Sequence, residues 1–186
     1  IQKLGGAGYV YLGMGHFALA GGYLAVGQAN GSLHRNFMGY STHADSDLIG
    51  LGVSAISHIG NSFSQNPREL VGWEAAIDRG RLPVWRGMHL DEEDVIRADV
   101  IQRLMCSGSL DFREISQRHV IDFKEYFAEP LQRLQPLQAD GLVELGTDGL
   151  TATSRGRLLL RIIAMCFDRY LPAAVENAPA RFSRTI

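Results

Sequence analysis

The stretch from 34 to 60 joins a crowded polar cluster to a nearly continuous apolar run. Its second half, LIGLGVSAISHI over 48–59, contains almost no charge. Such a run is typical of a strand covered on both faces, as in the parallel sheet of an α/β fold. Gly50, Gly52 and Gly60 interrupt or end it, and glycine in a strand often marks a bend or a close approach of backbone to ligand. The run predicts a buried parallel strand over 48–59.

The polar cluster ahead of this run predicts a ligand pocket. Its members are His34, Arg35, Asn36, Tyr40, Ser41, Thr42, His43, Asp45, Ser46 and Asp47. A polar cluster that leads into a buried strand is the arrangement of a ligand site on an α/β sheet. A solvated loop before an ordinary core strand would give the same pattern, and the residues alone leave both interpretations open. A metal site from His34, His43 and Asp45 would have loose spacing, so no metal is expected.

Composition excludes several classes of protein. The chain has 186 residues, of which 46% are hydrophobic and 20% charged, as in one ordinary globular domain or slightly more. A formal net charge of -2 predicts no bulk attraction to nucleic acid or to an anionic membrane. Two distant cysteines fit a reducing cytoplasm, and no apolar stretch approaches the roughly 20 residues of a membrane helix. A cytoplasmic protein is expected.

The first half of the chain reads as short elements separated by glycines. We expect a strand over 9–14 and about one turn of helix over 23–29. Asn66, Pro67 and Glu69 have the residue types of a helix start, which predicts a capped helix over 67–79. A strand at 48–59 followed by that helix would be one α/β unit at the end of a barrel.

The second half changes character at Asp91, which predicts an N-cap followed by a helix with Ala98, Ile101 and Met105 on one face. Helices begun by Asp111 and Asp122 should follow. A hairpin is expected over 142–152, and then a helix over 155–170 with a stripe of Leu158, Ile162, Cys166 and Tyr170.

This order of helices and hairpin is that of a winged helix. Residues 91–186 carry 12 basic and 15 acidic side chains, a net charge of -3. Because DNA-binding domains need a basic surface, we expect a packing domain and no nucleic-acid partner.

Five strings together indicate a family. They are LHRNFMGY (33–40), DSDLIGLGVSAIS (45–57), WRGMHL (85–90), MCFDRYL (165–171) and RFSRTI (181–186). In this order they resemble the oxygen-independent coproporphyrinogen III oxidases, radical S-adenosylmethionine enzymes of haem biosynthesis. The resemblance implies an α/β chain. Its residues 1–90 would be the C-terminal part of a radical-SAM (β/α) barrel with a connector, and residues 91–186 a mainly helical, winged-helix-like domain.

The resemblance also implies cofactors and a reaction. The substrate would be coproporphyrinogen III, whose oxidative decarboxylation gives protoporphyrinogen IX. The cofactors would be S-adenosylmethionine and a 4Fe-4S cluster, supplied with electrons by a donor protein. The family holds the cluster on a CxxxCxxC motif, whereas this chain has only Cys106 and Cys166. We therefore expect the cluster ligands upstream, and a C-terminal part that is inactive alone and has no catalytic residue of its own.

Site residues follow from the resemblance and from side-chain chemistry. Phe37, Met38 and Ile56 match positions that line the family's S-adenosylmethionine site. As substrate contacts we expect Arg35, whose planar fork suits a propionate, together with His34 and Tyr40. For each the alternative is structural: core packing for Phe37, Ile56 and Tyr40, or an ion pair of Arg35 with Asp45 or Asp47.

Two positions depart from the family pattern. Gly15 stands where the family has an aspartate, and Met38 where bacterial members carry glutamine, so a thioether replaces an amide. These changes keep two alternatives open, a haem-handling paralogue and a non-catalytic interaction module. The strings HRNFMGY, GVSAIS and RFSRTI favour the enzyme over the paralogues. The oligomeric state is left open.

Overall fold

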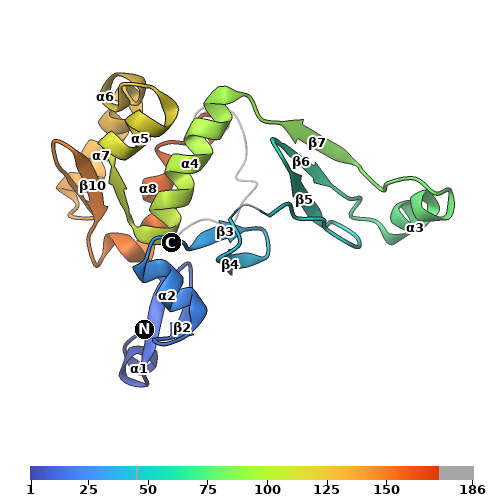
Figure 1. Cartoon of the computed structure of the whole chain (residues 1–186), viewed down its shortest axis with the longest axis horizontal. Helices are drawn as coiled ribbons and strands as arrows, with labels where there is room; N and C mark the ends of the chain where they lie inside the picture. Colours follow the sequence, from blue (N-terminus) through green and yellow to red (C-terminus); the bar gives the residue numbers. More distant parts are fainter. Residues whose placement is uncertain (45, 172–186) are drawn as a thin grey trace.

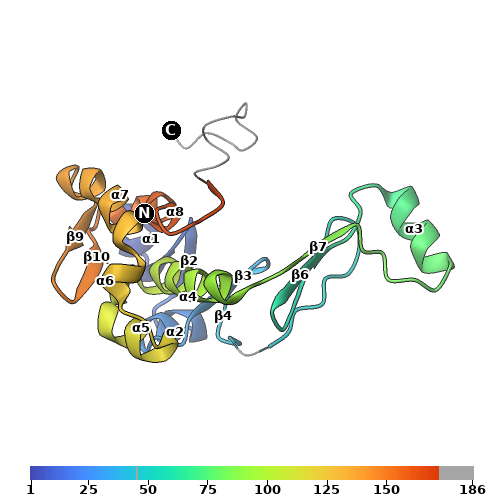
Figure 2. The same ribbon diagram turned by 90° about the horizontal axis from the view of Figure 1, so that it is seen from above.

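The structure is a computed structural model that describes residues 1–44 and 46–171, so the string RFSRTI (181–186) lies outside the described residues. Three parts meet around helix α4 (Glu92–Ser107): an N-terminal unit, a projecting arm and a helical C-terminal unit (Figure 1). The view from above shows the arm extending away from the other two parts, with helix α3 (Leu70–Asp78) at its far end (Figure 2). The strands of the described chain form four small sheets, and none closes into a barrel.

The N-terminal unit holds two hairpins and two short helices. Helix α1 (Gln2–Gly6) precedes β1 (Tyr9–Gly13), which pairs antiparallel with β2 (His16–Leu19). Helix α2 (Tyr23–Ala29) leads to a second hairpin of β3 (His34–Asn36) and β4 (Gly39–Ser41). The predicted strand over 9–14 and helix over 23–29 are confirmed.

The arm is an antiparallel sheet, so the predicted buried parallel strand over 48–59 is wrong. Its strands are β5 (Ile56–Ile59), β6 (Ser62–Gln65) and β7 (Arg86–His89), and α3 lies between the last two. Residues 49–55 form a loop instead of strand. A Cβ on Gly50 would lie 2.8 Å from the Ile56 carbonyl oxygen, and Ser54 has a φ of 56°. The glycines therefore allow a tight loop. The apolar composition of the run does not distinguish such a loop from a strand.

The start of α3 also differs from prediction. The helix begins at Leu70 after Glu69, with no side-chain cap, and the expected cap Asn66 is buried elsewhere. Its amide Nδ2 donates to the carbonyl oxygens of Gly52 (2.7 Å) and Gly50 (3.4 Å). Asn66 therefore closes the loop of 49–55 and does not cap the helix.

The C-terminal unit has the predicted order of helices and hairpin. After α4 come β8 (Ser109–Asp111), α5 (Phe112–His119), α6 (Phe123–Tyr126), α7 (Ala128–Ala139), β9 (Val143–Leu145), β10 (Gly149–Ala152), η1 (Gly156–Leu159) and α8 (Leu160–Met165). Strand β10 lies between β8 and β9 in an antiparallel sheet. The aspartates at the starts of α5 and α6 cap them, as predicted.

Helix α4 begins with the expected cap, and its buried face matches the predicted one in part, because Ile101 and Met105 pack in or against the core. Asp91 accepts from the Asp94 amide N–H and the Asp94 carboxylate accepts from that of Asp91, a capping box. Its core face carries Ile96, Val100 and Leu104, with Met105 beside them. Ala98 was expected in the core and instead lines a cavity on the opposite side. The helix touches the core on one side and β3 on the other, so its apolar residues do not mark a single face.

The predicted helix over 155–170 is broken into η1 and α8. A Cβ on Gly156 would lie 1.8 Å from the Leu142 carbonyl oxygen. The backbones of these two residues are therefore in direct contact, with no room for a side chain between them. Phe167 is buried after α8, whereas Leu158 and Tyr170 are about half exposed, and the predicted stripe is wrong. The buried side chains gather in the C-terminal unit around the rings of Phe112, Phe123, Phe127 and Phe167.

No helix of the described residues is both long and apolar enough to span a membrane.

Candidate functional site

A cavity of about 360 Å³ lies where the β3–β4 hairpin, the arm and α4 meet. Its lining residues come from all three parts: His34, Arg35, Asn36 and Phe37 from the hairpin, His58 and Phe63 from the arm, and Ala98, Asp99 and Gln102 from α4. The predicted polar cluster thus does contribute to a cavity. The residues of α4 were not predicted, because nothing in their sequence marks them apart from an ordinary helix surface.

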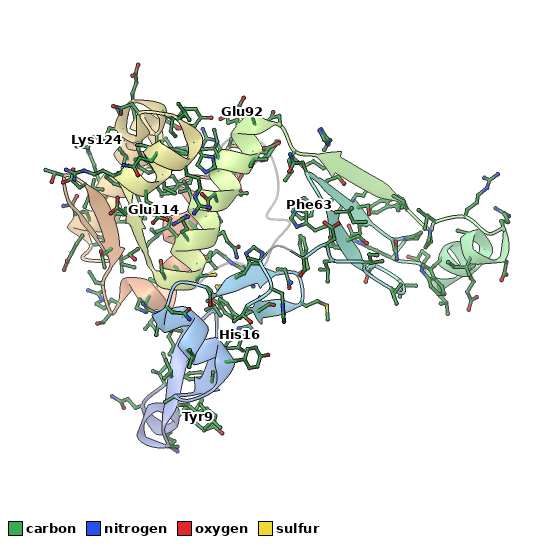
Figure 3. All side chains as sticks on the ribbon, viewed as in Figure 1. Tyr9, His16, Phe63, Glu92, Glu114 and Lys124 are labelled. Carbon is green, nitrogen blue, oxygen red and sulfur yellow. The ribbon has the colours of Figure 1, made fainter. Side chains whose placement is uncertain are left out.

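The arm supplies an aromatic wall. Phe63 lies opposite His58 in the β5–β6 register, and their rings stack with centroids 4.2 Å apart. Phe37 meets the Phe63 ring edge-on at 5.6 Å. Figure 3 shows Phe63 on the part of the arm nearest the body. Ile56 is two residues from His58 and therefore lies on the same face of the sheet. The structure brings Phe37 and Ile56 to one side of the arm.

Phe37 and Met38 form the two-residue tip of the β3–β4 hairpin. Asn36 pairs with Gly39 across the turn, and the Asn36 Oδ1 atom accepts from the Met38 amide N–H at 2.9 Å. Phe37 is 59% exposed and turns its ring to the arm, whereas Met38 is 84% exposed and does not line the cavity. Met38 is therefore not one of the described residues that line this cavity.

Arg35 is a cation without an ion pair from the described residues. Its Nε is buried and has no hydrogen-bond partner, and its guanidinium lies 5.8 Å from the centroid of the Tyr40 ring. Asp47, one of the two expected partners, instead accepts from the Gly60 amide N–H at 2.9 Å. The other, Asp45, lies outside the described residues. A buried cationic donor without a partner is costly, so this position favours an anionic ligand group.

Tyr40 fastens the hairpin to α4. Its hydroxyl donates to the Met105 carbonyl oxygen at 3.0 Å, and burial raises its pKa to about 12. The ring of His16, which follows the β1–β2 turn (Figure 3), packs edge-on against it at 5.3 Å. Tyr40 is not among the residues that line the cavity, and its hydroxyl is already occupied.

A second cavity, of about 590 Å³, lies beyond His34, which lines both.

Asp99 also borders both cavities. The largest influence on its pKa is burial, which raises it. The hydrogen bonds from His119 (2.8 Å) and Arg103 (3.0 Å) and the charges of Arg103 and Arg118 outweigh burial and hold the pKa below its usual range. His119 is thus a structural partner of Asp99, a pairing across 20 residues that the sequence does not reveal.

The cysteines do not form a metal site. Burial raises the pKa of Cys106 to about 12 and also raises that of Cys166, so neither is an activated thiolate. Among residues 1–44 and 46–171 no group of three or more His, Cys, Asp or Glu side chains could hold a metal ion. The residues present therefore do not fit an iron–sulfur cluster.

Gly15 lies in the β1–β2 turn, away from the cavity. Met14 and Gly15 have φ values of 49° and 77°, the signs of a tight hairpin turn with two left-handed residues. Aspartate and asparagine also tolerate this backbone. Glycine at this position is compatible with the same turn.

Comparison with known proteins matches residues 90–159 to the HemN C-terminal domain. The chain is 48% identical over 185 residues to the oxygen-independent coproporphyrinogen III oxidase of Pseudomonas aeruginosa, covering 100% of this chain and 40% of that protein. The Salmonella typhimurium protein of the same name is 50% identical over 186 residues, with the same two coverages.

A solved structure gives the same result. It is that of coproporphyrinogen III oxidase (HemN) from Escherichia coli, which is described as a radical SAM enzyme. The match covers 91% of this chain and 39% of that one, with a TM-score of 0.88 and 48% identity.

The chain is thus similar, along its whole length, to part of proteins named oxygen-independent coproporphyrinogen III oxidase. It spans about 40% of the length of these relatives. The resemblance expected from the five sequence strings is thereby confirmed. The HemN C-terminal domain begins at Leu90, one residue before the cap of α4. Helix α4, which lines the cavity, therefore lies within the matched C-terminal domain.

Proposed function

We propose that the chain serves in the oxidative decarboxylation of coproporphyrinogen III to protoporphyrinogen IX, as part of an oxygen-independent oxidase. The observation that carries this proposal is the 48–50% identity along the whole chain to proteins named for that activity. The same similarity supports the enzyme over a haem-handling paralogue or a non-catalytic interaction module. Radical S-adenosylmethionine chemistry in the cytoplasm, with an electron donor as protein partner, is part of the same proposal.

Within this chain the proposed contribution is to bind and orient. Phe37 and Ile56 share one side of the arm, and an aromatic and a branched aliphatic side chain suit the adenine and sulfonium of S-adenosylmethionine. When bound, that cofactor supplies the group that abstracts hydrogen from a propionate, and the protein positions it. Met38 is proposed as a peripheral contact because the tip of the hairpin exposes it.

The substrate side is proposed to be the β3–β4 hairpin. Arg35 has the charge for a propionate, and His34 borders the same cavity. Tyr40 contributes by holding the hairpin on α4 through its bond to the Met105 carbonyl. No step is assigned to an iron–sulfur cluster, because the described residues offer no ligand set for one.

The division of the chain is proposed as residues 1–90, which extend a radical-SAM barrel, and residues 91–186, which pack as a winged-helix-like domain. The order of α4, α5, α7 and the β9–β10 hairpin supports the second part. Its net charge of -3 favours packing within an enzyme over binding to DNA.

A chimeric enzyme tests the proposal. The 185 matching residues of the Pseudomonas aeruginosa protein are replaced by this chain. The cluster-loaded chimera is then assayed anaerobically with S-adenosylmethionine, a reductant and coproporphyrinogen III. We expect conversion to protoporphyrinogen IX, measured by chromatography of the oxidised products. A folded chimera that carries its cluster but makes no product would contradict the proposed function.

A further inference from the structure

The C-terminal end of α4 is held by side chains from three other segments. The last four carbonyl groups of an α-helix have no partner inside the helix. In α4 the first of them, that of Leu104, accepts from the Gly108 amide N–H at 2.9 Å. The carbonyls of Met105, Cys106 and Ser107 accept from Tyr40 Oη (3.0 Å), Gln28 Nε2 (3.1 Å) and Arg157 Nη1 (3.1 Å), in that order. Two of these three donors belong to the N-terminal unit, which lies at this end of the helix (Figure 1).

Gln28 joins two elements through one amide group. Its Nε2 atom donates to the Leu12 carbonyl oxygen at 2.9 Å as well as to that of Cys106, so both amide hydrogens are used. Leu12 is fully buried in β1, and Gln28 lies in α2. A planar amide that donates in two directions fixes both carbonyl groups relative to each other. One side chain therefore connects β1 to the end of α4, across 78 positions of the sequence.

Two glycines leave the space that this contact needs. A Cβ on Gly13 would lie 2.6 Å from the Tyr40 Oη atom, which donates to α4. A Cβ on Gly27, the residue before Gln28, would lie 2.8 Å from the Thr42 Cγ2 atom. A larger residue at either position would move the Tyr40 hydroxyl or α2 from its place. The close approach of α2, the two hairpins and α4 thus depends on the absence of side chains at these glycines.

These contacts determine the distance between two walls of the candidate site. The β3–β4 hairpin, which carries Tyr40, forms one wall, and α4 forms another. Gln102 lines the cavity about one helical turn before Cys106, so a shift of the helix end moves it too. Gln28 itself is not among the described residues that line this cavity. A change at Gln28 can therefore reach the site only through α4 and the N-terminal unit.

We propose that Gln28 is a positioning residue, which holds the N-terminal unit on the end of α4 and so fixes the separation of hairpin and helix at the candidate site. The inference rests on the proposed function in one respect, because that separation then affects turnover. None of the described residues of α2 belongs to the core of the C-terminal unit. Substitution of Gln28 should therefore alter the site and leave that core intact.

Amide hydrogen exchange in the chimera with the Pseudomonas aeruginosa protein tests whether Gln28 holds the two units together. Gln28→Leu removes both donors at similar size, and Gln28→Glu keeps the shape but replaces the donors with acceptor oxygens. Loss of two neutral hydrogen bonds should speed exchange in peptides covering 9–19 and 34–41 by roughly 5- to 100-fold. Peptides covering 109–119 and 128–139 should exchange as before. Gln132→Leu, the same change at an exposed position of α7, is the matched control.

Two further measurements separate positioning from a general effect on stability. Spin labels carried by unnatural amino acids at the exposed positions Met38 and Glu92 report the distance between the hairpin tip and α4. Its distribution should broaden in both Gln28 variants and stay unchanged in Gln132→Leu. In an active chimera, kcat per assembled cluster should fall about 10- to 100-fold, because the reacting groups are misaligned. The KM for coproporphyrinogen III should change by less than about twofold, since the groups that bind it remain.

Faster exchange in both hairpins, a broader distance distribution and an unchanged C-terminal unit support the inference. No change in exchange or distance overturns it, and so does faster exchange of similar size across 109–139, which would make Gln28 a stabiliser of the whole fold. An unaltered kcat in an active chimera whose hairpins exchange faster also overturns it. An inactive chimera that retains Gln28 contradicts the proposed function alone, because exchange and distance still decide whether Gln28 positions the two units.

Discussion

At the scale of single residues, Gly156 and Met38 differ most in how closely other atoms surround them. Gly156 has no room for a side chain, since a Cβ there would lie 1.8 Å from the Leu142 carbonyl oxygen. Met38, at the hairpin tip, touches almost nothing. The first position constrains stability and the second can affect only binding. Substitutions at these two positions should therefore separate folding from function.

Gly156→Ala should destabilise the C-terminal unit strongly. Forcing a methyl group against backbone shifts β9 relative to η1, and overpacking of this kind costs about 1–3 kcal/mol or more. Gly146→Ala is the control, because its Cβ would meet the nearest atom at 3.5 Å, an ordinary contact. Urea unfolding of both variants should show a large loss for Gly156→Ala only. Equal stability of the two would mean that the contact at Leu142 relaxes freely.

Met38→Gln tests the peripheral contact. Because Met38 is exposed, the change should leave the melting temperature unaltered. If the side chain reaches S-adenosylmethionine in the chimera, the amide should tighten binding by about two- to tenfold, the equivalent of one neutral hydrogen bond. Calorimetry on the cluster-loaded chimera measures this. Unchanged affinity would place Met38 outside the binding site.

At the scale of elements, α4 joins the whole molecule together. Its start is held by Arg169, which pairs with Asp91 (2.7 Å), Glu93 (3.0 Å) and Asp94 (3.1 Å), and by the Tyr170 hydroxyl, which donates to Asp94 at 2.9 Å. Later residues of the same helix line the cavity on the other side. The position of Gln102 therefore depends on contacts made at the helix start.

Asp94→Ala should release this attachment. Asp94 is buried and completes the capping box, so its loss leaves donors from Asp91, Arg169 and Tyr170 without their acceptor. We expect a loss of about 1–3 kcal/mol, seen as a lower melting temperature. Glu92→Ala, an exposed first-turn residue of the same helix, should change stability little. A loss of similar size for both would point to the helix dipole rather than to the attachment.

The pairing of α4 with α5 should give an acid-sensitive contribution to stability. Asp99 has a folded pKa below the ordinary value of about 3.9, so its contribution is complete at neutral pH and is lost as pH falls through the folded pKa. The difference in the free energy of unfolding between the unchanged chain and Asp99→Asn should therefore be largest near pH 7 and become small below about pH 4. Denaturant unfolding across pH measures it. Asp148→Asn, at an exposed pair with Arg113, should show no such difference.

At the scale of the whole molecule, the sequence predicted the resemblance to known proteins and the order of elements better than it predicted the tertiary arrangement. Short-range signals succeeded, as at the Asp91 cap, because a cap depends on residues three apart. The parallel strand over 48–59 failed, because glycines that shape a loop look like glycines in a strand. Phe37 and Arg35 were predicted at a site, whereas Gln102 was not. Its place in the cavity lining comes from contact between segments more than about 60 residues apart, which a single sequence does not report.

The central claim is that ligand binds where the hairpin, the arm and α4 converge, and hydrogen–deuterium exchange with and without ligand tests it most directly. Coproporphyrin III or S-adenosylhomocysteine, whichever binds, should slow exchange together in peptides covering 34–40, 56–65 and 92–107. Peptides covering 128–152, on the far side of the C-terminal unit, should not change. Protection confined to that far side, or to one of the three segments alone, would contradict a site built jointly by all three.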